Sequence, residues 1–375
     1  MSLRHFNLLY SSNKMPKKLM INRIKRKDNF NEMPLINNLK EMPLIKYPFN
    51  YTDDPHGPTI TEELVYTNIC FNIYFENPYY ICYTFNNAMS ESASYCDIKE
   101  PVEMLLLSTT NPAHSLGEFT SFLEYYNAKT TKLKVCINAV IAEKMPYLYQ
   151  LIQQFFPSEN CIIIVSNTIY HFHSIIMRRN HHFMYSINWR NIPYISTNNI
   201  LHFSNLQPQY LVNCDQLFNK AKEIYETHKH KYSLSDTLMI IKTTKEKYSV
   251  SIHRALEYPT ADIIDLLVAR GVKIVEISQF SDIFEYICTI YHAKNIIFSY
   301  GGPMCTNRFF CNPAANIIVL ANLHYKHEYN LHYDPDMYPH LRFSMIAPVK
   351  NQHFLLDFDN RLTIENSKQF LSLLV

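Results

Sequence analysis

An apolar run that leads into two adjacent glycines occupies residues 295–310, which read NIIFSYGGPMCTNRFF. The run has the length and character of a buried strand, and Thr306 is a suitable N-cap for a helix from about Asn307. Glycine lets a backbone approach a ligand closely, and the chain has only five glycines, two of them Gly301 and Gly302. The stretch therefore predicts a parallel strand that ends at a ligand site, as in open α/β sheets.

Strand and helix patterns alternate around this stretch. In the C-terminal half, strands are expected at 237–242, 272–277, 295–299 and 317–320, and helices at 214–228, 260–270, 281–291 and 362–374. In the N-terminal half, strands are expected at 64–74, 79–85, 102–107, 134–140 and 161–165, and helices at 115–126 and 145–156. Such alternation predicts parallel sheets with helices on their faces.

Two such halves within 375 residues predict an α/β fold with two Rossmann-like domains facing across a cleft. We place an irregular N-terminal arm at 1–60, a first domain at 61–213 and a second domain at 214–375. Residues 170–215 are polar and rich in His and Asn, and we interpret them as the connection between the halves.

The composition excludes several classes of protein. The net charge of +2 gives no global field that would attract nucleic acid or an anionic membrane. The nine cysteines contain no CxxC pair and no metal-ligand spacing. The N-terminus has no apolar run of signal-peptide length, and no apolar run in the chain has the length of a membrane span. We expect a soluble, cytoplasmic protein with no nucleic-acid partner and no transmembrane segment, of undetermined oligomeric state.

The stretch at 295–310 resembles the hallmark of glycosyltransferase family 61, which reads roughly His-Gly-(Ala/Ser)-(Gly/Ala)-Leu-Thr-Asn, then an apolar pair, a proline and a β-strand. Six residues are in register: Gly302, Thr306, Asn307, Phe309, Phe310 and Pro313. The family histidine is replaced by Gly301, which removes any ligand contact made by that imidazole. The resemblance covers about residues 100–370 and is strongest over 236–322.

This resemblance implies a GT-B fold, as in the superfamily of O-GlcNAc and xylosyl transferases. It also implies an inverting, metal-independent transfer of sugar from a nucleoside-diphosphate donor, such as a UDP-sugar, to a glycan or glycoprotein hydroxyl, with no cofactor. Helix N-terminal N–H groups and basic side chains would hold the diphosphate. The candidate donor-binding residues are Lys242, Arg254, Gly301, Gly302, Thr306 and Asn307.

A second motif, at residues 111–119, reads NPAHSLGEF and resembles the Asn-x-x-His-x-x-x-Asp element of the same family. His114 matches the family histidine, and Glu118 stands where the family has Asp. Residues four apart share one face of a helix. A histidine titrates near neutral pH and therefore suits a general base. Either His114 is the base and Glu118 orients it, or Glu118 is the base and His114 contacts a substrate.

Two other functions remain open. The missing family histidine at Gly301 is compatible with an inactive, glycosyltransferase-like binding or scaffold protein. Asp357 and Asp359 follow an apolar run, as do the metal-binding carboxylates of metal-dependent GT-A transferases. Their position at the end of the chain, and the similar Asp334–Asp336 pattern before them, favour a structural role.

A histidine cluster completes the candidates. It contains His171, His173, His181 and His182, and no Cys or carboxylate joins it at ligand spacing in the sequence. We interpret it as a polar loop and expect no metal site.

Overall fold

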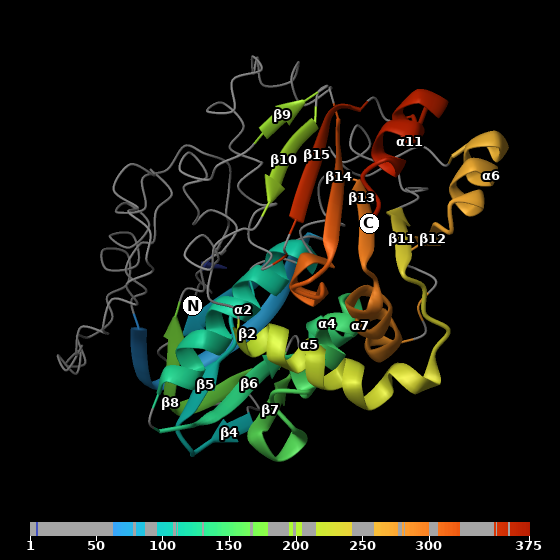
Figure 1. Ribbon diagram of the computed structural model, residues 1–375. Helices are drawn as coiled ribbons and strands as arrows, with labels where there is room; N and C mark the ends of the chain where they lie inside the picture. The colour runs from blue at the N-terminus through green and yellow to red at the C-terminus, as the bar shows by residue number, and fades with distance from the viewer. Residues whose placement is uncertain are drawn as a thin grey trace. The chain divides into compact units, whose positions relative to one another are not determined.

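A computed structural model of the protein (Figure 1) contains two sheets, each in its own compact unit. The structure describes residues 5–6, 63–77, 80–86, 96–107, 110, 112–129, 131–165, 168–178, 195–197, 200–204, 215–241, 259–276, 280, 282–299, 307–322, 349, 351–358 and 361–375. The described residues up to 178 belong to the first unit and those from 195 onward to the second. Among these residues, no helix is long and apolar enough to cross a membrane.

The sheet of the first unit combines parallel and antiparallel strands. Its strands are β1 (His5–Phe6), β2 (Glu63–Asn77), β3 (Tyr80–Asn86), β4 (Cys96–Ile98), β5 (Val102–Met104), β6 (Lys134–Asn138), β7 (Cys161–Ile164) and β8 (Tyr170–Arg178). The order is β1-β3-β2-β8-β5-β6-β7, and β4 pairs with β8. Strands β8, β5, β6 and β7 run parallel, whereas β2, β3 and β1 extend the sheet in antiparallel pairing beyond β8.

Helix α2 (Pro112–Ala128) has the apolar face that the sequence predicts, and Leu116, Phe119, Phe122 and Leu123 are all buried. Aromatic rings extend this core: the centroid of Phe119 lies 5.6 Å from that of Phe155, and Phe122 lies 5.9 Å from Phe156. The helix expected at 145–156 is observed as α4 (Pro146–Gln153), preceded by α3 (Ala139–Lys144). Further along the chain, just before β7, lies the 3-10 turn η1 (Ser158–Asn160).

The second unit contains the doubly wound sheet that the sequence predicts. Its strands are β9 (Ile195–Thr197), β10 (Ile200–Ser204), β11 (Thr237–Ile241), β12 (Lys273–Glu276), β13 (Asn295–Ser299), β14 (Asn316–Asn322) and β15 (Asn351–Phe358). Their order is β12-β11-β13-β14-β15-β10-β9. The first five strands in this order are parallel, whereas β10 pairs antiparallel with both β15 and β9. Counted from β11 in chain order, the parallel strands lie as 2-1-3-4-5, an order typical of Rossmann-like nucleotide-binding sheets.

Helices cover both faces of this sheet (Figure 1). On one face α6 (Ala261–Ala269) contacts α11 (Ile364–Leu371), and a buried cluster joins Leu267 and Phe370 to Met239, Ile297 and Ile318 of the strands. On the other face lie α5 (Asp215–His228), α7 (Ile283–His292) and the 3-10 turn η8 (Arg308–Phe310), which contact one another. A further 3-10 turn, η5 (Lys229–Lys231), follows α5. Successive strand residues point to opposite faces, which explains why these strands are apolar throughout.

The structure corrects the interpretation of residues 170–215 as a connection. Residues 170–178 form β8 in the middle of the first sheet, and β9 and β10 belong to the second sheet although they precede residue 214. In β8 the buried positions shift from Tyr170 and Phe172 to Ile175 and Met177. That change of phase removes the regular alternation by which a strand is recognised. Within the predicted arm, His5–Phe6 pairs with β3.

Candidate functional site

The predicted donor-binding segments follow two neighbouring strands of the second sheet. In sheets of this kind, ligands bind beyond the carboxyl ends of the strands, where the strand order reverses. Here the reversal falls between β11 and β13, which pair Ile240 with Phe298 and so end side by side. In the sequence, Lys242 directly follows β11, and Gly301 comes two residues after β13. Two segments far apart in the chain thus follow strands that end at one edge of the sheet.

Asn307 is the one predicted donor-binding residue that lies within the described ranges. Its side chain is fully buried just before η8, and its Oδ1 accepts a hydrogen bond from the hydroxyl of Tyr286 in α7. The main-chain oxygen of Asn307 lies 3.5 Å from the Cys311 Sγ. Lys242, Arg254, Gly301, Gly302 and Thr306 lie outside the described residues. The Asn307 Oδ1 is therefore engaged by α7 inside the protein and is not presented to a ligand.

The apolar pair after Asn307 also anchors this segment. Phe309 and Phe310 are buried, and the ring of Phe310 meets that of Tyr286 edge to face at 5.7 Å. Tyr286 in turn packs edge to face against Phe280 at 5.0 Å. The motif residues 307–310 are consequently anchored on α7, a helix of the same unit.

The second predicted motif lies at the start of α2, after β5. In the first sheet β6 lies on one side of β5 and β8 on the other, so the order of the parallel strands reverses there. His114 is in the first turn of α2, and its side chain is not among those described. Glu118, one turn further on, is only 2% exposed. A carboxylate so buried needs hydrogen-bond partners, and it does not meet an incoming acceptor directly in the free protein.

Asn138 is a candidate that the sequence analysis missed. It is the last residue of β6, and because Met104 pairs with Cys136, it lies level with the chain that leads from β5 to α2. Its Oδ1 accepts a hydrogen bond of 3.0 Å from the N–H of Val140 and so caps α3. Its Nδ2 is buried and has no hydrogen-bond partner in the part of the protein that is described. A buried donor without a protein partner is uncommon, and a water molecule or a ligand can satisfy it.

The sequence does carry a signal for Asn138: this asparagine precedes the run AVIAEK, and an N-cap residue followed by helix-forming residues predicts a helix start. The apolar run that precedes this asparagine obscured the signal, because it favoured a strand that continues to Val140.

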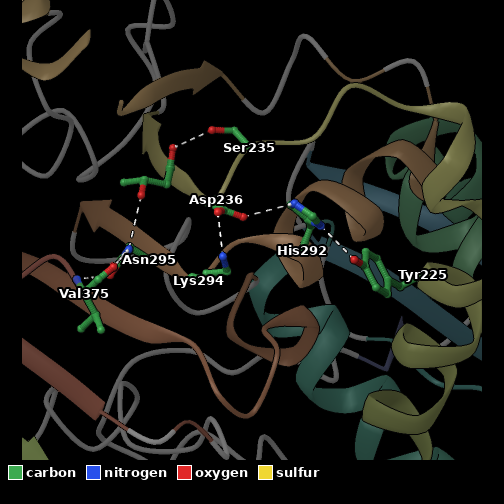
Figure 2. A network of polar contacts seen from close by, with 8 residues as sticks. Tyr225, Ser235, Asp236, His292, Lys294, Asn295 and Val375 are labelled. Atoms are coloured by element: carbon green, nitrogen blue, oxygen red, sulfur yellow. Dashed lines mark hydrogen bonds and ion pairs between the residues drawn. The ribbon is translucent and has the colours of Figure 1, made fainter. Parts of the chain in front are cut away.

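A network of polar side chains lies at the opposite, amino-terminal end of the second sheet (Figure 2). The Tyr225 hydroxyl lies 2.8 Å from His292 Nδ1, and His292 Nε2 lies 3.4 Å from Asp236. Lys294 donates to Asp236 over 2.8 Å, and this hydrogen bond is the main reason why the pKa of Asp236 is lowered. The Tyr–His–Asp order resembles a proton relay. However, Asp236 precedes β11 and Lys294 precedes β13, so the network ties strand starts together and lies away from the ligand-binding edge.

Only some of the remaining acidic and histidine candidates lie within the described residues. Asp357 is in β15 with its side chain undescribed, and Asp334, Asp336 and Asp359 lie outside the described residues. The interpretation of the histidine cluster as a polar loop is wrong for His171 and His173, which lie in β8. His181 and His182 are outside the described ranges.

Neither a known protein family nor any curated protein sequence matches this chain significantly. The resemblance to family 61 therefore rests on the motif residues themselves, and the function has to be argued from the site.

Proposed function

We propose that the protein is an inverting glycosyltransferase that uses a nucleoside-diphosphate sugar as donor and a saccharide or protein hydroxyl as acceptor. The observation that carries this proposal is the position of the donor motif. The segments that begin with Lys242 and Gly301 were selected because each follows an expected strand and resembles family 61, and these two strands lie side by side where the strand order reverses. If the glycine segment were only a strand-to-helix turn, there would be no reason for a basic segment to follow the neighbouring strand β11.

Donor binding would use charge and backbone rather than a metal ion. Lys242 and Arg254 supply positive charge for the diphosphate, and the glycines allow backbone N–H groups to approach it. Asn307 positions this segment through Tyr286, so its influence on the donor is indirect. The proposal also requires the two ligand-binding edges to face each other across a cleft, as in a GT-B transferase.

The transfer itself needs one base. The acceptor hydroxyl attacks the anomeric carbon, the bond from that carbon to the diphosphate oxygen breaks, and the base takes the hydroxyl proton. We assign the base to His114, because Glu118 is too buried to reach an acceptor and is one helical turn away, where it can orient the imidazole and stabilise its charged form.

Purified protein tests the proposal in two steps. Calorimetry with a panel of nucleoside-diphosphate sugars should find one donor that binds, and Lys242→Ala should weaken its binding while Lys222→Ala, an exposed lysine of α5, leaves it unchanged. Release of nucleoside diphosphate on adding saccharide or peptide acceptors should then follow. Donor binding without release under any condition would favour the inactive scaffold protein that the replaced histidine at Gly301 allows.

A further inference from the structure

Two histidines and an aspartate converge on one face of the first sheet. His171 and His173 are two residues apart in β8 and so point to the same side, and Asp97 of β4 pairs in register with His171. The Asp97 Oδ1 lies 2.7 Å from His171 Nδ1 and 3.0 Å from His173 Nε2. The two imidazole rings meet at a centroid distance of 4.9 Å. The sequence concealed this group, because 74 residues separate Asp97 from His171.

The three side chains have the chemistry and spacing of a metal site. One ligand atom from each lies within 4.8 Å of the other two. Around a tetrahedral ion with bonds of about 2.1 Å, neighbouring ligand atoms are about 3.4 Å apart, so the two distances from Asp97 Oδ1 would lengthen by roughly half an ångström around an ion. Two imidazole nitrogens and one carboxylate oxygen suit zinc and other first-row transition metals.

The surroundings also suit an ion that enters from solvent. The exposed fractions are 12% for the His171 side chain, 33% for Asp97 and 44% for His173, so the group is accessible while its backbone is fixed in strands. Ligands on strands are held more firmly than ligands on loops. Hydrogen bonds from both histidines keep the pKa of Asp97 below its usual value, so this ligand is ionised at neutral pH.

The site would have a structural task. Strand β4 is three residues long, and within the described part of the sheet it pairs with β8 alone. An exposed aspartate–histidine pair contributes little stability, whereas a bound ion closes the long chain segment between Asp97 and His171. The group also lies in the amino-terminal half of β8, away from the carboxyl edge at which α2 begins.

We propose that Asp97, His171 and His173 bind one divalent transition-metal ion of the Zn²⁺ type, which fastens β4 to β8. Metal-stripped full-length protein, titrated with Zn²⁺ against a chromophoric chelator, should bind one equivalent that Asp97→Asn and His173→Asn each lose. His230→Asn, which changes an exposed histidine elsewhere, is the matched control and should keep this equivalent. Zn²⁺ binding by Asp97→Asn and His173→Asn that equals wild type would overturn the proposal.

A second measurement distinguishes this ion from zinc held elsewhere by cysteines or other histidines. Zn²⁺ should raise the Tm of the wild-type protein and of His230→Asn, but not the Tm of the two ligand variants. Circular dichroism without metal should show that these variants remain folded, since Asn preserves the approximate size and polarity of both side chains. An equal Tm increase in all four proteins would place the stabilising ion at another site.

Discussion

A pair of histidines in the second sheet shows how one side chain links pH to stability. His202 of β10 and His353 of β15 pair in register, and their Nδ1 atoms lie 2.9 Å apart. One of these two nitrogens must accept the proton that the other donates, so the arrangement needs at least one neutral ring and is lost when both rings are charged. Burial, followed by the charge of His202, lowers the pKa of His353 to about 4, and burial also lowers the pKa of His202.

We therefore expect the free energy of unfolding to fall as the pH drops from about 6.5, the histidine pKa of an unfolded chain, to about 4. In this window the unfolded chain binds protons that the folded protein excludes, so stability rises with pH and is fully present above the window. Urea unfolding of wild type and His353→Gln at several pH values measures this, and the variant should show a shallower pH dependence. His230→Gln should keep the wild-type slope; an unchanged slope in His353→Gln would contradict the assignment.

The assignment of the base to His114 predicts a separation of binding from turnover. His114→Ala should lose roughly a hundred- to ten-thousand-fold in turnover, the usual contribution of a general base, while donor affinity stays near wild type. Glu118→Gln should also lower turnover, because the imidazole loses the charge that orients it. Steady-state kinetics on the true acceptor decide the matter. Near-normal turnover in both variants would make this pair structural.

Asn307 predicts a different result, because its side chain is buried against Tyr286. Asn307→Ala removes the oxygen to which that hydroxyl donates, which costs about 1–3 kcal/mol of unfolding free energy, and it should also weaken donor binding at residues 301–306, which precede it in the chain. Urea unfolding and calorimetry test the two effects separately. A normal donor affinity in a destabilised Asn307→Ala protein would move the donor site away from this segment.

At the scale of elements, local sequence predicted most of the second sheet. The strand expected at 295–299 is observed with the same ends, and Gly271 follows α6 as expected. Gly271 has a φ of 74°, its N–H donates to the oxygen of Val268 over 2.9 Å, and the N–H of Val272 donates to that of Leu267 over 3.0 Å. This double hydrogen bond is the Schellman motif, which requires a left-handed residue at the position of Gly271.

Replacement of Gly271 should consequently destabilise the protein for conformational reasons alone. A Cβ atom at this position would meet nothing within 4 Å, so no steric clash contributes. Gly271→Ala should lower the unfolding free energy by about 1–2 kcal/mol, and Gly271→Asn by less, because asparagine tolerates the left-handed region better. Urea denaturation should rank the proteins as wild type, Asn and Ala. An Ala variant as stable as wild type would contradict the argument.

The elements that escaped prediction depend on contacts distant in sequence. β4 is three residues long, too short for a periodic signal. β5 covers only Val102–Met104 of the strand expected at 102–107, and β6 ends early because Asn138 caps the next helix. β10 follows a polar segment and pairs with β15, about 150 residues later, and β9 pairs with β10. The candidate functional residues also divide into those recognised from sequence pattern and those recognised from their neighbours in space. Gly301, Asn307 and His114 were found by pattern, whereas Asn138, Tyr286 and Asp97 became apparent through their neighbours in space.

At the scale of the whole molecule, metal removal should affect stability and sugar transfer differently. If the donor diphosphate is held by Lys242, Arg254 and backbone N–H groups, transfer at moderate temperature should continue in EDTA. The same treatment should lower the Tm, because the ion between β4 and β8 is lost. Parallel activity and thermal-unfolding measurements with and without EDTA test both expectations. Transfer that EDTA abolishes and manganese restores would instead favour Asp357 and Asp359 as ligands of a catalytic metal.

Helix α2 places the proposed chemistry directly next to the core of the first unit. Glu118 is followed in the chain by Phe119, which is buried against the rings of Phe155 and Phe156. A change in the volume of that aromatic cluster would therefore tilt the helix that carries His114. Natural selection would then act on each of these phenylalanines twice, once through folding and once through reaction rate. Over evolutionary time this cluster should accept fewer substitutions than the equally buried face shared by α6 and α11.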